Sequence, residues 1–182
     1  MAGGRREFPV DESGHVIGTA CWYPPGTHIF ADDDQRNAGF NEAFKEVSDT
    51  LPRLRDWWLT TLLPRHDEVC EKFLATVQEP DGQRFLIDNW HLHSFCVAPK
   101  FQGMGIGKQL LAVGENLAKE GQSTVCLDTS TKELVAMYTK LGYTDRGHEY
   151  VEGIDGSQGF VIYVMTKSFA TPTPNFLHVG SD

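Results

Sequence analysis

The chain has 182 residues, two-fifths of them apolar, which is enough for one domain with its own core and too few for two comfortable ones. Its 16 basic and 25 acidic residues give a net charge of -9. Phosphate backbones are bound by concentrated basic surfaces, and the Lys and Arg residues here do not cluster beyond pairs, so the composition argues against a nucleic-acid-binding protein. Cationic small molecules are better-tolerated ligands for such a charge balance.

Cysteine usage and hydropathy bear on the compartment. The cysteines have neither the close pairs of a metal site nor the density of a small secreted scaffold, so we expect reduced, buried thiols at Cys21, Cys70, Cys96 and Cys126. Neither a signal-like apolar N-terminus nor an apolar run of membrane-spanning length is present. We therefore predict a cytoplasmic protein that does not bind a membrane.

The first half of the chain changes from strand-like to helix-like patterns. Residues 8–10 and 15–23 are β-prone runs on either side of "DESG", which predicts a strand, a turn and a strand. Residues 34–78 have apolar side chains at helical spacing and predict a helical insertion, which Pro52 and Pro64 divide into two or three helices. We expect its buried stripe to contain Trp57, Trp58, Leu62 and Leu63.

The second half alternates between strand and helix, which predicts a mixed α+β sheet. Residues 80–83 are typical of a turn. Ser130 followed by Glu133 forms a capping box that predicts a helix start, and Gly142 ends that helix. We expect strands over 85–97 (or a short strand leading into a central one), 124–128, 143–151 and 159–166, helices over 105–120 and 130–142, and a loosely held tail over 170–182.

Three alternating glycines, Gly103, Gly105 and Gly107, mark the junction between a predicted strand and a predicted helix. Without side chains in the way, main-chain N–H groups there can point at phosphate oxygens, and the helix N-terminus and Lys108 add positive charge. The alternative is a glycine-rich turn that serves close packing alone.

Two well-known phosphate loops fail on spacing. A P-loop requires Gly where Gln102 stands and Ser or Thr where Gln109 stands. A dinucleotide-binding fingerprint requires its third glycine at Lys108 and an acidic residue after a second strand, which is missing.

Two histidines precede this loop. In an unbroken strand His91 and His93 project to one face, while Leu92 and Ser94 project to the other. A near-neutral pKa suits histidine to take a proton from a protonated amine, directly or through a water. The alternatives are polar residues satisfied by neighbouring loops, or a zinc site with Cys96, which has the wrong parity unless a bulge intervenes.

The segment in between carries a family resemblance. Val97-x-Pro99 is followed by Gln102-x-x-Gly105-x-Gly107, and "MYTKLGY" follows downstream. Together these resemble the acyl-CoA-binding motif and the later Tyr-containing segment of the GNAT superfamily of N-acetyltransferases, over about residues 6–166 and most specifically over 90–143. "HLHSFCV" is similar to the His-Leu-His strand of the arylalkylamine N-acetyltransferases.

The resemblance implies a GNAT-like α+β fold: a mixed, mostly antiparallel central sheet flanked by helices. Residues 1–169 form a single acetyltransferase domain in this interpretation, with 34–78 as the helical insertion and 170–182 as a tail. The N-terminus is shortened relative to the family pattern, which normally has a strand and two helices first. The insertion is the expected site of acceptor recognition, with an aromatic pocket from Trp22, Tyr23, Trp57 and Trp58, some of which are alternatively plain core.

The resemblance also implies roles for residues. Acetyl-CoA is the cosubstrate and no metal is expected; His91 or His93 deprotonates a small-molecule or peptide amine, the amine attacks the thioester directly, and Tyr138 protonates the departing sulfur. Tyr138 as an ordinary core aromatic remains the alternative. Cys96 is a poor nucleophile because its parity places it off the histidine face. The expected acetyl-CoA-binding residues are Phe95, Cys96, Val97, Gln102, Gly103, Met104, Gly105, Ile106, Gly107 and Lys108.

A different class of function stays open at this point: an acyl-CoA-binding sensor, or a degenerate module that keeps the cosubstrate cleft without a complete acceptor site. The sequence leaves the acceptor, the acyl-chain length and the oligomeric state undetermined.

Overall fold

The structure, a computed structural model, describes residues 5–171. Its centre is a six-stranded sheet in the order β1-β2-β3-β4-β6-β5. Every neighbouring pair is antiparallel except β3 and β4, which run parallel. This confirms the predicted mixed, mostly antiparallel α+β sheet. The strands are β1 Arg5–Glu7, β2 Gly18–Tyr23, β3 Trp90–Val97, β4 Thr124–Thr129, β5 Thr144–Val151 and β6 Phe160–Ser168.

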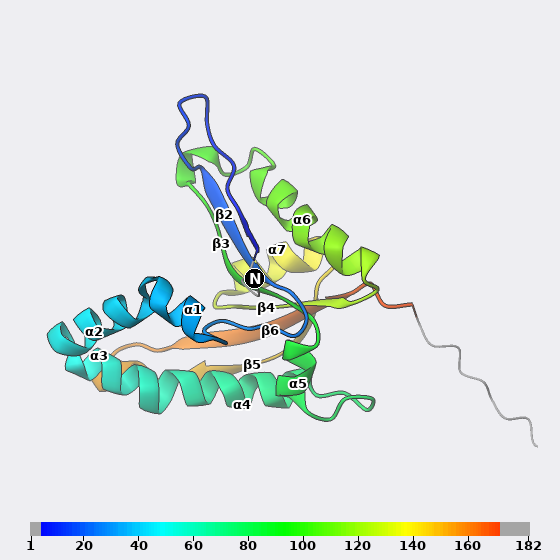
Figure 1. The fold of residues 1–182 in the computed structure, drawn as a ribbon. Helices are drawn as coiled ribbons and strands as arrows, with labels where there is room; N and C mark the ends of the chain where they lie inside the picture. Colours follow the sequence, from blue (N-terminus) through cyan, green and yellow to red (C-terminus); the bar gives the residue numbers. More distant parts are fainter. Residues whose placement is uncertain (1–4, 172–182) are drawn as a thin grey trace, which may run out of the picture.

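Helices cover both faces of the sheet (Figure 1). On one face α6 (Ile106–Glu120) and α7 (Lys132–Lys140) share a core with alternate residues of β4, Val125 and Leu127. On the other face α4 (Leu63–Leu74) packs over Cys126 and the inward side chains of β6. Because successive strand residues point to opposite faces, β4 supplies side chains to two separate cores.

The stretch predicted as a helical insertion is largely helical over 33–74, and Pro52 begins a helix as expected. Pro64 does not interrupt it, because Leu62 and Leu63 keep right-handed helical torsions and a π-helical segment leads directly into α4. In the wider π-helical turn before α4, no hydrogen bond requires the N–H group that Pro64 lacks, so the proline is tolerated. Leu63 is 45% exposed, so its predicted place in the buried stripe is wrong. The segments are α1 Asp33–Gln35, η1 Arg36–Phe40, α2 Asn41–Thr50, α3 Pro52–Trp57, η2 Trp58–Leu62 and α4.

In the second half of the chain, one strand and one helix begin later than predicted. Residues 85–87, expected in a strand, belong to helix α5 (Gly82–Ile87), and β3 begins only at Trp90. The Asp81 side chain accepts a hydrogen bond from the Arg84 N–H at 2.7 Å, and this cap nucleates the helical turn despite the β-prone side chains. Helix α7 is capped by Thr131 and not by Ser130, because the Thr131 hydroxyl accepts from the Leu134 N–H at 3.2 Å.

The N-terminal hairpin is shifted. The first strand lies at residues 5–7, and Val10 makes only an isolated bridge with Val16. The predicted tail over 170–182 lies almost wholly outside the described residues.

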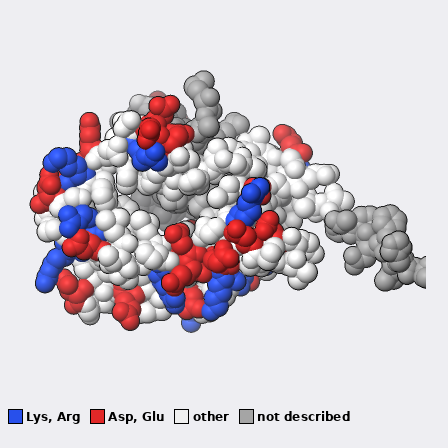
Figure 2. All heavy atoms as spheres, turned by 60° about the horizontal axis from the view of Figure 1, so that its bottom comes forward, with Lys and Arg blue, Asp and Glu red and all other residues white. Residues whose placement is uncertain are grey.

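Within residues 5–171, no helix combines the length and apolarity that crossing a bilayer requires. Basic and acidic side chains are intermixed over the face shown in Figure 2. That face therefore offers no continuous basic surface for a polyanion.

Candidate active site

The site begins where two parallel strands part. β3 pairs with β4 only over Trp90, His91 and Leu92, whereas its pairing with β2 on the other side continues to Val97. From His93 onward, the main chain of β3 that faces β4 is therefore free of a strand partner. Such an open edge can pair its main-chain groups with an extended ligand.

A β-bulge at His93 changes the alternation of β3. The β2–β3 register shifts between Cys21 and Trp22, which leaves His93 as the extra residue. As a result Leu92, Phe95 and Val97 all pack on the core beneath α6. The sequence prediction assumed an unbroken strand, so its placement of Cys96 off the His91 face is wrong: after the bulge, Cys96 lies on the His91 side of the sheet.

The glycine loop between β3 and α6 has features of both interpretations of the motif, an open main chain that can bind phosphate and a glycine that allows close packing. Gly103 and Gly105 have φ of +77° and +81°, and nothing lies within 4 Å of a Cβ at either position. The positive φ at these two positions requires glycine, because other residues rarely adopt it. With this backbone, the loop stays open before the first turn of α6. At Gly107, in contrast, a Cβ would lie 3.1 Å from the Phe95 ring, so this glycine lets the helix approach the strand.

The other loop residues divide into an anchor and exposed groups. The Gln102 side chain donates to the Val97 carbonyl at 3.0 Å and its N–H donates to the Pro99 carbonyl at 3.2 Å, so Gln102 fixes the loop to the end of β3. Met104 and Lys108 are exposed beside the helix N-terminus. The first-turn amides of α6, a 15-residue helix, have no intrahelical partner, so they remain available to bind an anion.

A cavity of about 270 Å³ lies beside the point of divergence and brings two of the three predicted catalytic residues together. His93 and Tyr138 both line it, whereas His91 is buried and lies behind His93, with the two rings 5.7 Å apart at 82°. The full lining is Leu92, His93, Phe95, Asp128, Thr129, Ser130, Leu134, Tyr138, Phe160 and Ile162.

The surroundings set the protonation of both cavity residues. Loss of hydration, and then the neighbouring His91 ring, lower the pKa of His93, which favours its neutral imidazole. Burial, and then the negative charge of Asp128, raises the pKa of Tyr138 to about 12, so its phenol keeps its proton. The cavity thus holds one proton acceptor and one proton donor.

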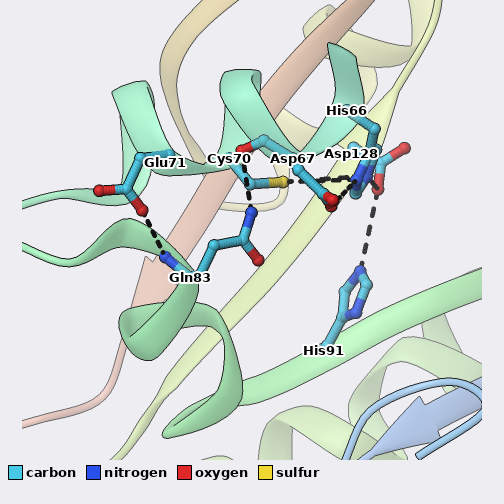
Figure 3. Close-up of polar contacts among 7 residues, drawn as sticks. All are labelled: His66, Asp67, Cys70, Glu71, Gln83, His91 and Asp128. Carbon is cyan, nitrogen blue, oxygen red and sulfur yellow. Dashed lines mark hydrogen bonds and ion pairs between the residues drawn. The ribbon is translucent and has the colours of Figure 1, made fainter. Parts of the chain in front are cut away.

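Two polar residues at this site were missed by the sequence analysis. Asp128 follows the buried part of β4, and His66 projects from α4 (Figure 3). The His66 Nε2 lies 3.5 Å from the Asp128 Oδ1, and the His91 Nε2 lies 3.8 Å from the same oxygen. The position of Asp128 at the carboxyl end of a parallel strand was a usable signal; nothing local marks His66.

The predicted aromatic acceptor pocket does not form. Trp22 is fully buried beneath Gly114 of α6, and Tyr23 is only 6% exposed. Trp57 donates its Nε1–H to the Glu152 carbonyl at 2.8 Å, and Trp58 contacts the Phe44 ring. None of the four lines the cavity.

Comparison with known proteins agrees with this geometry. Residues 75–164 match the family model described as an acetyltransferase (GNAT) domain. This part of the chain, slightly less than half of it, is therefore similar to a GNAT acetyltransferase domain. The domain and its fold indicate acyl-CoA-dependent acetyl transfer. No curated protein sequence matches the chain significantly.

Solved structures share the fold at low identity. Naa20 of Chaetomium thermophilum, in complex with a bisubstrate analogue, has 18% identity and a TM-score of 0.51, over 88% of this chain and 64% of that one. Nourseothricin acetyltransferase has 15% identity and a TM-score of 0.50, over 91% and 65%. A mosquito arylalkylamine N-acetyltransferase like 5b has 20% identity over 86% and 70%, at a TM-score of 0.48. The chain thus spans slightly less than two-thirds of the first two structures.

Proposed function

We propose that the chain is an acetyl-CoA-dependent N-acetyltransferase that moves an acetyl group to a primary amine of a small molecule or peptide, with His93 as the base and Tyr138 as the acid. The observation that supports it best is the cavity itself: His93 and Tyr138 line one space of about 270 Å³ beside the open edge of β3.

The described residues fit acetyl-CoA. The amides from Gly103 to Lys108, at the N-terminus of α6, suit a diphosphate, and the open edge of β3 from Phe95 to Val97 suits the amides of an extended chain. Acetyl-CoA, when bound, supplies an acetyl group activated as a thioester. A main-chain N–H at that edge is placed to polarise a carbonyl oxygen.

His93 rather than His91 removes the proton of the amine, because His93 lines the cavity and His91 is buried behind it. An amine nitrogen is nucleophilic only after it loses its proton, and a neutral imidazole accepts that proton near pH 7. The lowered pKa of His93 keeps it in this neutral form. The main chain of β3 places it, since the bulge turns this one residue out of the regular alternation.

Tyr138 supplies the second proton, to the sulfur that leaves. A free phenol is a weaker acid than a free thiol, so complete transfer is uphill in water. In the cavity, the low hydration and the charge of Asp128 that raise the pKa of Tyr138 also raise the proton affinity of a thiolate formed beside it. Tyr138 therefore acts at least as a hydrogen-bond donor to the developing charge and completes the transfer as the bond to sulfur breaks.

The lining favours a cationic acceptor. It contains the carboxylate of Asp128 and no Lys or Arg, together with apolar side chains at Leu134, Phe160 and Ile162. A protonated amine meets no Lys or Arg in this lining and can approach the Asp128 carboxylate, which it would share with His66.

The test is an assay of the purified chain with acetyl-CoA and a panel of arylalkylamines, polyamines, aminoglycosides and peptide N-termini. Free thiol and the mass of the acetylated product are measured together. We expect thiol release that depends on an acceptor and matches the product formed. Saturable binding of acetyl-CoA without acceptor-dependent thiol release from any member would contradict transferase activity and favour an acyl-CoA sensor.

A further inference from the structure

Asp128 stands between two imidazoles that come from distant parts of the chain (Figure 3). His66 reaches it from α4, 62 residues away in sequence, and His91 reaches it from β3. Both present Nε2 to the same carboxylate oxygen, Oδ1, at 3.5 and 3.8 Å. One carboxylate therefore links the helical insertion to the strand that carries the proposed base.

The charges of this arrangement are complementary. Hydrogen bonding to Asp128, and then to Cys70, raises the pKa of His66 to about 11, so His66 is an imidazolium cation at neutral pH. Burial opposes the charge of Asp128, but the hydrogen bond with His66 at 3.5 Å and the nearby His91 ring outweigh burial and hold the pKa of the carboxyl below its usual range. His66 thereby compensates the carboxylate, and the carboxylate remains an acceptor for a second N–H.

The carboxylate selects one form of the His91 ring. A neutral imidazole carries its hydrogen on one nitrogen only, and an anion beside Nε2 favours the hydrogen there. Nδ1 of His91 is then the nitrogen with the lone pair, and the ring is held in one orientation. Because the His91 and His93 rings are in edge contact at 5.7 Å, the orientation of one restricts the other.

We propose that Asp128 is a positioning residue of the acetyl-transfer site that holds His91 in one tautomer and orientation behind His93, and that His66 of the helical insertion is its counter-ion. The role rests on the acetyl transfer proposed for the same cavity. His66 lies on α4, before the residues that match the family model, 75–164.

A Cys–His–Asp nucleophile is the competing interpretation of the same cluster, and the geometry opposes it. The Cys70 Sγ lies 3.8 Å from both ring nitrogens of His66, so it is not in line with either one as a proton donor. Cys70 is also 3% exposed and does not line the cavity. Its thiol is closed to an acyl donor.

Several other groups that can carry charge or donate protons face this cluster from the surrounding elements. They contribute to any pH dependence measured there, and they are Asp67 and Cys70 of α4, Tyr138 of α7, Tyr23 of β2 and His93 of β3.

The experiment compares Asp128→Asn, His66→Gln and His66→Lys with wild type, and Glu68→Gln serves as the control. Glu68 lies on the same helix as His66 and forms an ion pair with Arg65 outside the cluster. The kinetic readouts are kcat, the KM of acetyl-CoA, and the pH profile of kcat at saturating acceptor.

We expect Asp128→Asn to lower kcat about 10- to 100-fold, because a misplaced base loses most of its effect. His66→Gln is expected to lower kcat less, about 3- to 10-fold, and His66→Lys, which keeps a cation, to recover most of that loss. The KM of acetyl-CoA stays unchanged in all of them, and Glu68→Gln matches wild type.

The direction of the pH shift separates positioning from a merely structural role. The negative charge of Asp128 raises the pKa of His93, and the positive charge of His66 lowers it. Asp128→Asn therefore moves the acidic limb of kcat to lower pH, and His66→Gln moves it to higher pH. Shifts in the same direction, no shift in either variant, or losses of kcat that follow only the melting temperature would overturn the proposal.

NMR titration of the His93 imidazole gives the same test without turnover. Opposite movements of its pKa in the two variants are expected even when the right acceptor has not been found. If the wild type acetylates no amine, the proposed function fails, while the titration still supports or contradicts the coupling of Asp128 and His66 to His93. Should Asp128→Asn fail to fold, His66→Gln and His66→Lys carry the test: a His93 pKa unchanged in His66→Gln contradicts the proposal.

Discussion

The two sides of the cavity are built by different means. On the side of β3 and α6, the functional groups are main-chain amides, exposed where the strand leaves β4 and where Gly103 and Gly105 adopt positive φ. On the side of α4, the functional groups are charged side chains, His66 and Asp128, that meet across 62 residues of sequence. The main-chain groups depend on local backbone geometry, and their hydrogen bonding does not change with pH. The His66 and Asp128 side chains depend on tertiary packing, and their charges change with pH.

A large effect is expected at Tyr138, which lines the cavity opposite the proposed base. Tyr138→Phe removes the proton donor and should lower kcat about 100-fold with little change in the Kd of acetyl-CoA, as is typical for loss of one acid or base. Stopped-flow measurement of thiol release checks this.

Tyr143→Phe is the matched control for Tyr138→Phe. The two rings are in edge contact at 5.4 Å, and the Tyr143 hydroxyl is buried with no hydrogen-bond partner among the described residues. Removing it should leave kcat unchanged and stability equal or higher. Equal losses of kcat in the two variants would show that packing, and not proton donation, is the role of Tyr138.

The main-chain side is tested by a pair of glycines with nearly the same φ. Gly105 and Gly26 have φ of +81° and +83°, and a Cβ at either meets nothing within 4 Å. Alanine should cost each site a similar free energy of unfolding, about 1 kcal/mol, because both leave the favoured backbone region.

Only Gly105→Ala should weaken acetyl-CoA binding, by about tenfold, because only that loop presents its amides to the diphosphate. Isothermal titration calorimetry measures the two values of Kd. Equal affinities in both variants would remove the phosphate-binding role from the loop.

The smallest effect concerns the pH dependence of stability on the side-chain side. His66 titrates near 6.5 when unfolded and at about 11 in the fold, so its contribution is fully present below about pH 6.5 and is lost as the pH rises toward 11. The pKa of Asp128 is lowered, so its contribution is present above the ordinary value of 3.8 and is lost as the pH falls. The ion pair should therefore stabilise most between about pH 4 and 6.5.

Urea unfolding of wild type and His66→Gln measures this contribution. With both side chains about one-third exposed, we expect a difference of about 1 kcal/mol in the free energy of unfolding at pH 5.5 and a smaller one at pH 8.5. A larger difference at pH 8.5 would contradict the assigned charges. Glu68→Gln should show no such trend.

The contrast between local backbone geometry and tertiary packing also explains which features the sequence could predict. Helix α6 and strands β4 and β5 depend on patterns within a few positions of one another, and each lies within one residue of its predicted bounds. The bulge at His93 was not predictable from side-chain alternation, because it arises from the register with β2. Asp81 overrode the β-prone residues after it by capping a helix, and His66 had no local signal because its partner is fixed only by packing.

The most direct test of the central claim compares wild type and His93→Ala at saturating acetyl-CoA and acceptor. The cavity geometry makes His93 the group that takes the proton of the amine. We predict acceptor-dependent thiol release at least about 100-fold slower in His93→Ala, with an unchanged KM for acetyl-CoA. Equal rates in the two proteins would contradict the account.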